Sequence, residues 1–212
     1  RILDAASAGQ RLVMAGHTSR FDPRFVAAAA AVQRGDIGDV IHAFARRNNP
    51  SSRLARLGNR VSVAGFLGVH DFDLLVWIIN KPVHRVFARG VRRTLAASGL
   101  DDCIISLLTF ADGTLAVVEN SWCTPEVQGR PGQVRFELRG VKGIIEIDAT
   151  SQGFAIHTPD AARSPDMWFR PELYGWITGM YRDAMEHFMA CVQTRQHPVI
   201  DGQEGMAAVR EL

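Results

Sequence analysis

The sequence predicts an α+β fold in which helices pack on one face of a largely antiparallel, open β-sheet of about six strands. Segments rich in β-branched and aromatic residues follow one another between residues 83 and 158, and glycine-containing turns join several of them. Helical patterns precede and follow this region. Apolar residues make up 47% of the 212-residue chain and charged residues 22%, which is the composition of a globular domain with a sizeable core.

Helix and strand signals alternate through the first sixty residues. Asp22 can cap a helix and Pro23 fits its first turn, so an alanine-rich helix is expected to begin there. Arg53, Arg56 and Arg60 are interpreted as solvated surface unless an anionic ligand lies nearby. In order, the expected elements are a helix end at 2–8 closed by Gly9, a strand at 12–15, a polar turn at 16–23, a helix at 24–34, a strand at 40–47 and a polar loop at 48–60.

The second half of the chain contains most of the predicted strands. Ala111-Asp112-Gly113 is expected to join two strands as a hairpin turn, and Gly140–Gly143 joins another pair. Pro171 is expected to begin a long amphipathic helix that ends near Thr194. The expected elements are strands at 83–93, 103–110, 114–122, 133–139, 143–148 and 153–158, followed by helices at 171–194 and 203–212.

The stretch from Gly65 to Ile79 predicts a helix that is apolar nearly all round, as a helix buried in a core is. Its first turns nevertheless carry His70, Asp71 and Asp73. Ionisable groups are costly to bury unless they are paired, and they gather where chemistry is done. A histidine near a helix N-terminus is also kept neutral by the helix dipole and can act as a base. The alternative is a purely structural helix start, capped by the two aspartates with the histidine as a core residue.

Charge and cysteine content exclude several classes of protein. The net charge is +2, so bulk electrostatics gives no reason to expect a nucleic acid or an anionic membrane as a partner. No apolar run reaches membrane-spanning length, and the first residues do not resemble a signal peptide. Cys103, Cys123 and Cys191 lack the spacing of a disulfide framework or a zinc site, which favours a reduced, cytoplasmic protein.

An ordered set of short motifs carries a family resemblance. Each motif is weak alone, but their order and spacing along nearly the whole chain are fairly specific. Together they resemble the C-terminal half of the Gfo/Idh/MocA oxidoreductases. The motifs are Gly16-His17-x-x-Arg20-Phe21-x-Pro23, Gly35-Asp36-Ile37-Gly38, Gly68-Val69-His70-Asp71-x-Asp73-Leu74-x-x-Trp77, Asp112-Gly113, Glu119-Asn120-Ser121-Trp122, Gly140-x-x-Gly143 and His197-Pro198-Val199.

The resemblance implies part of a two-domain enzyme. An upstream Rossmann domain would bind NAD or NADP, with residues 1–10 as its remnant, and residues 11–212 would form the substrate and oligomerisation domain. This chain lacks the Gly-x-Gly-x-x-Gly turn that cradles dinucleotide phosphates, so alone it is expected to be inactive. The implied substrate is a sugar, a polyol or a related hydroxy compound, and the implied assembly is a homo-oligomer formed through the sheet face.

The resemblance also implies a role for His70, which matches the family histidine that acts as acid or base on the substrate hydroxyl. Many members have an aspartate four residues earlier, where this chain has Phe66. Asp71 or Asp73 would therefore have to orient His70, and Asp73 is taken as the second catalytic residue.

Further candidates for substrate binding are Arg20, Arg46, Asn48, Asp71 and Tyr174. Arg46 and Asn48 could donate to sugar hydroxyls, or they could lie at a sheet edge. For Arg20 a structural role at the domain junction is favoured. Tyr174, like Trp122 and Trp168, could stack on a sugar ring or pack in a core.

Two other functions stay open on the sequence alone. The first is a non-catalytic dimerisation or ligand-binding module derived from an enzyme, which the missing aspartate at position 66 favours. The second is metal-dependent hydrolysis by His70, Asp71 and Asp73. It is the weakest hypothesis, because Asp71 points away from the other two residues on a helix.

Overall fold

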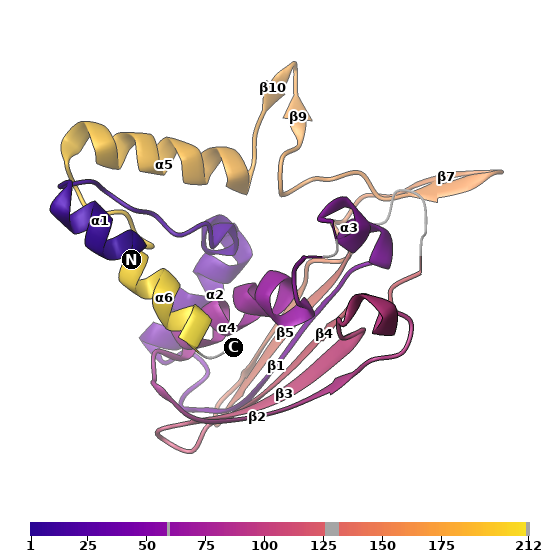
Figure 1. The fold of residues 1–212 in the computed structure, drawn as a ribbon, viewed down its shortest axis with the longest axis horizontal. Helices are drawn as coiled ribbons and strands as arrows, with labels where there is room; N and C mark the ends of the chain where they lie inside the picture. The colour runs from indigo at the N-terminus through magenta and orange to yellow at the C-terminus, as the bar shows by residue number, and fades with distance from the viewer. Residues whose placement is uncertain (59, 126–131, 211–212) are drawn as a thin grey trace.

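The computed structural model describes residues 1–58, 60–125 and 132–210. A six-stranded sheet in the order β2-β3-β4-β1-β5-β6 forms one side of the molecule, and helices cover one of its faces (Figure 1). This confirms the α+β class, the sheet and the helical layer. The strands of the sheet are β1 (Val40–Asn48), β2 (Val83–Val91), β3 (Cys103–Phe110), β4 (Leu115–Ser121), β5 (Gln133–Gly140) and β6 (Ile144–Asp148).

The sheet is mixed, so the expectation of a largely antiparallel open sheet is wrong. β1 and β4 pair in parallel at its centre, with Arg46 beside Glu119 and Arg47 beside Asn120. The other pairs in the sheet are antiparallel. After β1 the chain crosses over through helices before it forms the β2-β3-β4 meander, and a crossover of this kind is what allows parallel pairing. The meander then places β4 beside β1, and the two strands run in the same direction.

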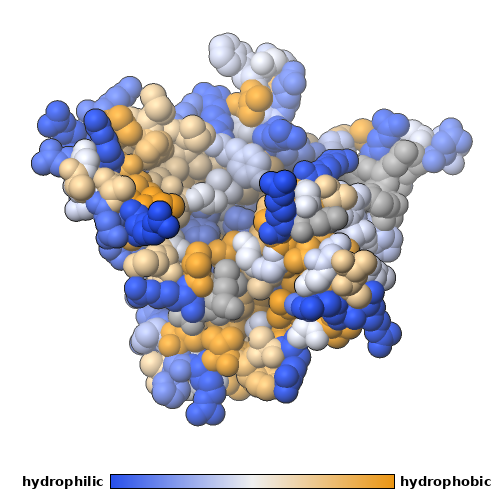
Figure 2. Space-filling model, viewed as in Figure 1, coloured by the Kyte–Doolittle hydropathy of each residue, from blue (hydrophilic) through white to orange (hydrophobic). Residues whose placement is uncertain are grey.

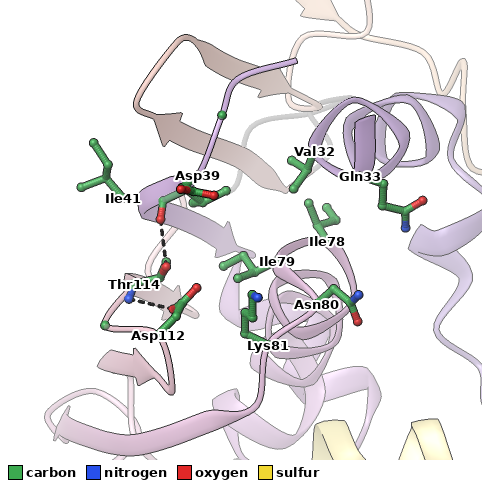
Figure 3. A pocket seen from close by; sticks show the side chains of 13 residues that line it. Val32, Gln33, Asp39, Ile41, Ile78, Ile79, Asn80, Lys81, Asp112 and Thr114 are labelled. Carbon is green, nitrogen blue, oxygen red and sulfur yellow. Dashed lines mark hydrogen bonds between the residues drawn. The ribbon is translucent and has the colours of Figure 1, made fainter. Parts of the chain in front are cut away.

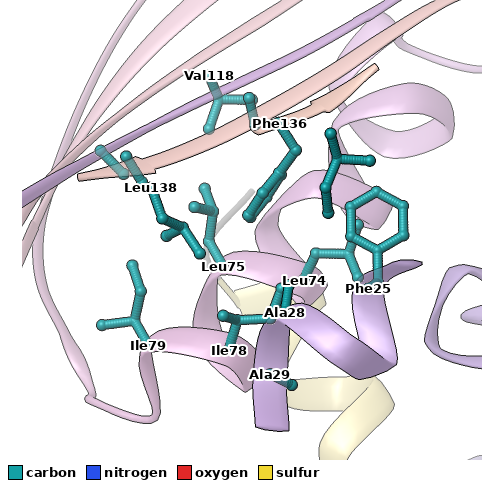
Figure 4. Close-up of a cluster of buried hydrophobic side chains, with 14 of the residues drawn as sticks. Phe25, Ala28, Ala29, Leu74, Leu75, Ile78, Ile79, Val118, Phe136 and Leu138 are labelled. Carbon is teal, nitrogen blue, oxygen red and sulfur yellow. The ribbon is translucent and has the colours of Figure 1, made fainter. Parts of the chain in front are cut away.

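The main core lies between the sheet and the two helices α2 (Pro23–Arg34) and α4 (Val69–Ile79). Leu74, Leu75 and Ile78 of α4 are completely buried (Figure 4). Phe25 of α2 meets Phe136 of β5 edge-on, with ring centroids 5.5 Å apart. Burial of large apolar side chains in this layer is the dominant stabilising contribution, and it holds α4 against the sheet.

A second, smaller core lies at the N-terminal end of α4. It is built from Leu54, Val63, Leu67 and Trp122. Leu54 belongs to α3 (Ser51–Arg56), so the prediction of a polar loop at 48–60 is wrong where α3 forms. The apolar Leu54 anchors this short helix over the end of β4, and its basic residues remain outside.

The region after the sheet differs most from expectation. A helix was predicted from Pro171, but residues 172–177 form a hairpin of β9 (Glu172–Leu173) and β10 (Trp176–Ile177), and α5 (Met180–Thr194) begins only afterwards. Gly175 and Gly179 adopt φ values of 83° and 88°, which a continuous helix does not allow. The hairpin projects from the molecule at the top of Figure 1.

The two terminal helices agree with expectation at the level of type. α1 (Ile2–Ala8) and α6 (Gly202–Arg210) are helices, and residues 211–212 of the second predicted helix lie outside the described residues. The predicted strand at 12–15 is reduced to a single bridge from Met14 to Asp201. The short elements are η1 (Thr18–Phe21), η2 (Ala64–Gly68), η3 (Ala96–Ser98), β7 (Ile156–Thr158) and β8 (Ala161–Arg163).

The sheet face turned away from the helices carries exposed apolar side chains. Phe87 is 57% exposed, Ile105 50%, Leu107 40% and Leu115 43%. In the view of Figure 2, hydrophilic side chains mark much of the outline, and apolar ones show mainly in the middle, over α4 and the nearby strands.

Within the described residues, no helix combines the length and apolar character needed to cross a membrane.

Candidate active site

α4 comes close to the sheet at Gly68, the residue before its first turn. A Cβ atom at this position would lie only 2.7 Å from Oδ1 of Asn120 on β4. The π-helical turn η2 runs directly into α4, and no side chain caps the start of the helix. The structural alternative in which Asp71 and Asp73 cap the helix is therefore wrong, and both side chains are free to make other contacts.

Asp71 reaches from α4 to the sheet, where it forms a buried ion pair with Arg47 of β1. Arg47 Nε donates to Oδ1 at 3.0 Å, and Asn120 Nδ2 donates to Oδ2 at 2.8 Å. The Asp71 residue is 1% exposed and Arg47 8%. Burial raises the pKa of Asp71, while Arg47 and Asn120 act in the opposite direction.

Asp73 lies on another side of α4 from Asp71 and pairs with a different arginine. Arg20 of η1 donates to both carboxylate oxygens, from Nη2 at 2.7 Å and from Nε at 3.0 Å. Arg20 also donates to Glu204 of α6 at 3.1 Å. Fork-shaped pairing of this kind fixes orientation as well as charge. Arg20 thus links η1, α4 and α6.

His70 stands between these two ion pairs. Its ring meets that of His17 edge-on, with centroids 6.0 Å apart, and His17 Nε2 lies 3.9 Å from Asp73 Oδ1. Burial lowers the pKa of His70 to about 3, and the charge of Arg47 and the proximity of His17 act in the same direction. The imidazole is therefore neutral at physiological pH.

The expectation that Asp71 or Asp73 orients His70 is not met within the described residues. Both carboxylates are taken by arginines, and buried His70 Nδ1 has no hydrogen-bond partner there. A buried nitrogen without a partner loses the hydrogen bond that water would supply.

A pocket of about 620 Å³ opens beside His70. Its walls combine residues from α3, from the ends of β1 and β5, and from the segment between β8 and α5. Arginines are prominent, with one acidic side chain among those that line it. The lining residues are Arg47, Asn49, Arg53, Arg56, Leu57, Phe66, Leu67, His70, Gly132, Val134, Ser164, Asp166, Phe169, Arg170 and Tyr181.

Two predicted substrate-binding residues lie on the opposite face of the sheet. Arg46 donates to Glu119 from Nε at 2.9 Å and from Nη2 at 2.8 Å, and Asn48 Nδ2 donates to Glu119 at 2.7 Å. Arg46 lines a separate pocket of about 690 Å³. Because side chains alternate along a strand, Arg47 is the residue of this segment that reaches the His70 pocket.

The predicted aromatic contacts are also dispersed. Tyr174 lies in the turn of the β9–β10 hairpin and is 94% exposed. Trp122 is buried in the smaller core, where Phe66 stacks on it at a centroid distance of 5.7 Å. Trp168 packs under the guanidinium of Arg24 at 4.5 Å. The structure does not bring these three aromatic residues into the lining of the His70 pocket.

Sequence reasoning assigned no role to Arg47 or His17, and it interpreted Arg53 and Arg56 as solvated surface unless an anionic ligand lies nearby. In the structure, Arg47 shares its face of the sheet with buried Ala43 and Ala45, but the sequence alone does not show that these residues rather than Phe44 face the core. His17 sits in the same Gly-His-x-x-Arg turn that supplies Arg20. Its position beside His70 depends on long-range packing that spacing does not reveal.

A pocket of about 640 Å³ lies at the other end of α4 (Figure 3). Lys81 and Asp112 face it, and Thr114 is held by hydrogen bonds to Asp112 and to the Val40 carbonyl. The residues that line it include no histidine or cysteine. We assign no chemistry to this pocket.

Comparison with known proteins identifies relatives along most of the chain. The sequence model described as GFO/IDH/MocA C-terminal domain matches residues 25–146. Myo-inositol 2-dehydrogenase of Thermotoga maritima is 28% identical over 99% of this chain and 62% of its own length. Inositol 2-dehydrogenase of Rhizobium meliloti is 24% identical over 93% of this chain and 59% of its own length. The chain thus spans about 60% of these relatives.

Solved structures show the same fold at low sequence identity. Scyllo-inositol dehydrogenase from Lactobacillus casei, with bound NAD(H) and scyllo-inositol, has a TM-score of 0.74 at 18% identity, covering 96% of this chain and 61% of that one. Aldose-aldose oxidoreductase from Caulobacter crescentus, complexed with glycerol, has a TM-score of 0.75 at 19% identity, covering 98% of this chain and 62% of that one.

Proposed function

The chain belongs to the GFO/IDH/MocA C-terminal domain family, and we propose that it supplies the substrate-binding part of an NAD(P)-dependent oxidoreductase. The substrate is a sugar, a polyol or a related hydroxy compound. The observation that carries this proposal is the position of His70, a neutral imidazole with an unpartnered nitrogen beside a pocket of about 620 Å³.

His70 serves as the acid or base on the substrate hydroxyl. Hydride transfer at a carbinol carbon requires the hydroxyl proton to be removed, and a neutral imidazole can accept it. Asp73 acts through its neighbours: Arg20 fixes its carboxylate, and His17 Nε2, on the ring that meets His70 edge-on, lies 3.9 Å from it. Asp73 is thus proposed as a positioning residue, and Asp71 as the residue that holds Arg47 at the pocket.

A nicotinamide dinucleotide would supply or accept the hydride. The residues of this chain do not fit the phosphates of such a cofactor, because the sequence has no Gly-x-Gly-x-x-Gly turn. We therefore propose that NAD or NADP is held by a domain upstream of residue 11, that residues 1–10 belong to that domain, and that residues 11–212 alone do not turn over substrate.

A non-catalytic binding or dimerisation module is the second candidate. Phe66 occupies the position where the family resemblance implies an aspartate, and its ring stacks on Trp122 instead of reaching His70. This replacement favours loss of the usual histidine–aspartate pair.

The exposed apolar face of the sheet is proposed to form a homo-oligomer. Phe87, Ile105, Leu107 and Leu115 are each at least 40% exposed. Apolar patches of this kind on a sheet commonly mark protein–protein contacts.

The test is a dehydrogenase assay on the complete gene product, following formation of NADH or NADPH with a panel of sugars and polyols. We expect His70→Asn to lower kcat by about 10²- to 10⁴-fold, because general base catalysis is lost, while the KM for the dinucleotide is unchanged. His84→Asn, on the exposed strand β2, is the matched control. Calorimetric titration of residues 1–212 with NADH and NADPH is expected to show no binding. Failure to reduce either dinucleotide with any compound in the panel would support the non-catalytic module.

A further inference from the structure

We propose that the His70 pocket binds a hydroxylated substrate that also carries an anionic group, a carboxylate or a phosphate. This inference rests on the proposed function and names its substrate class. The argument comes from the charges that line the pocket. Four arginines, Arg47, Arg53, Arg56 and Arg170, face one acidic side chain, Asp166.

Asp166 does not neutralise these arginine side chains. Its carboxylate accepts hydrogen bonds from the backbone N–H groups of Trp168, Phe169 and Arg170, at 3.1, 2.9 and 2.9 Å. The acid therefore closes a turn of its own segment. Among the described residues of the pocket walls, no other acidic side chain is available to Arg53, Arg56 and Arg170.

Three of the arginines have no side-chain partner among the described residues. Arg34, Arg92 and Arg182 on the surface each find a carboxylate, but Arg53, Arg56 and Arg170 do not. Near water, unpaired arginines gathered at one site repel each other only weakly. Together they nevertheless create a positive electrostatic potential inside a concave site. An anion is the ligand that such a potential favours.

Arg47 differs from the other three arginines of the pocket. It is 8% exposed, and its Nε and Nη2 atoms lie 3.0 and 2.9 Å from Asp71 Oδ1. The charge of Arg47 is therefore paired with Asp71, and the unpaired positive charge of the pocket comes from Arg53, Arg56 and Arg170.

The cations converge from two walls. Arg53 and Arg56 are three residues apart on α3 and so share one helix face, while completely buried Leu54 anchors the helix. Arg170 comes from the segment before β9, on the other side. Arginine binds planar or tetrahedral oxyanions through paired N–H donors. A volume of about 620 Å³ is within the range of small-molecule sites.

A neutral inositol or sugar offers nothing that requires three unpaired guanidinium groups. A sugar acid or a phosphorylated polyol does, and its hydroxyl can then lie at His70 while the anion lies at the arginines. Orientation of the reacting carbon would follow from binding the anion at a fixed place in the pocket.

The test compares ligands and arginine variants in the complete gene product. Calorimetry measures binding of D-glucuronate, D-glucose 6-phosphate and neutral myo-inositol, and the dehydrogenase assay measures their turnover. We expect at least one anionic ligand to bind about tenfold or more tightly than myo-inositol, and its affinity to fall as salt rises. The variants are Arg53→Gln with Arg56→Gln, and Arg170→Gln, with exposed Arg195→Gln at the end of α5 as the matched control.

The pocket variants are expected to weaken the anionic ligand about tenfold and to leave myo-inositol and the KM for the dinucleotide unchanged. Preference for the carboxylate or for the phosphate identifies the anion. Equal binding of neutral and anionic ligands overturns the inference, and so does a rise in the dinucleotide KM alone, which would assign the arginines to the cofactor phosphates. Oxidation of neutral polyols that depends on His70, without any anion preference, rejects this inference and leaves the proposed function standing. Anion binding without dinucleotide reduction supports the pocket and rejects the oxidoreductase.

Discussion

Asp71 on α4 and Arg47 on β1 form an ion pair that is almost closed to solvent, with Asp71 1% exposed and Arg47 8%. This pair ties the helix that carries His70 to the strand at the centre of the sheet. Asn120 of β4, the neighbour of Arg47 in the parallel register, binds the second oxygen of Asp71. The position of the histidine therefore depends on contacts made by both strands of the parallel pair.

Removal of one partner of this pair is expected to be costly. Asp71→Ala leaves the Arg47 charge buried without its counterion, and such a loss typically costs about 3–5 kcal/mol of the free energy of unfolding. Urea unfolding measures the change. Asp36→Ala is the control, because its pair with Arg34 is exposed to solvent and such pairs contribute about 0–1 kcal/mol. Similar losses in both variants would contradict a special role for the Asp71–Arg47 pair.

Gly68 is expected to tolerate no side chain. In Gly68→Ala the new Cβ would lie 2.7 Å from Asn120 Oδ1 and 3.3 Å from the Phe72 ring. Overpacking of this kind costs about 1–3 kcal/mol, and here it would also push the His70 turn away from β4. Thermal unfolding and the affinity for a ligand of the His70 pocket measure both effects. Gly16→Ala, which has open space around its Cβ position, should change neither quantity, and a Gly68→Ala protein that behaves like it would refute the argument.

Local pattern was enough to predict much of this fold. The alternation of apolar residues gave the strands, and the nearly all-apolar run after Gly68 gave α4, because those patterns express burial directly. The same reasoning failed at 171–177, where Ile177 fits a helical stripe with Met180 and only the glycines at 175 and 179 indicated a break. The parallel pairing of β1 with β4 depends on a crossover that no local pattern encodes.

The candidate site was predictable only in part, from the residues whose local pattern is unusual. His70 stood out because an ionisable group in an apolar helix is unusual. Its surroundings come from distant segments: Arg47, His17 and Arg170 reach it through the fold and not through sequence spacing. Arg46 and Asn48 lie on the face of β1 opposite the His70 pocket, whereas Arg47 lines that pocket; which face a strand turns to the core is decided by long-range packing.

The exposed sheet face provides a test of assembly. Leu107→Asp places a charge in the middle of the apolar residues of this face, where Leu107 is 40% exposed. We expect an oligomer of the complete gene product to dissociate, because burial of an unpaired charge at an interface is strongly unfavourable. Size-exclusion chromatography with light scattering reads the mass directly. Val26→Asp on α2, where Val26 is 45% exposed, should leave the mass unchanged. A wild-type monomer, or a Leu107→Asp protein of unaltered mass, would count against this interface.

His70 should leave a signature in the dependence of stability on pH. Burial, aided by Arg47 and His17, lowers its folded-state pKa to about 3 from the ordinary 6.5. At pH values between these two pKa values, the unfolded chain binds more protons at this residue than the folded chain does. The free energy of unfolding therefore increases as the pH is raised through this range, and decreases as the pH is lowered below 6.5. His70→Asn removes this contribution and should flatten the slope by at most about 1.4 kcal/mol per pH unit. Urea unfolding between pH 4 and pH 7 measures the slope, with His84→Asn on the exposed strand β2 as the control. Equal slopes in wild type and His70→Asn would mean that the folded protein admits the imidazolium, and hence that the pocket around His70 is more open to water than its burial indicates.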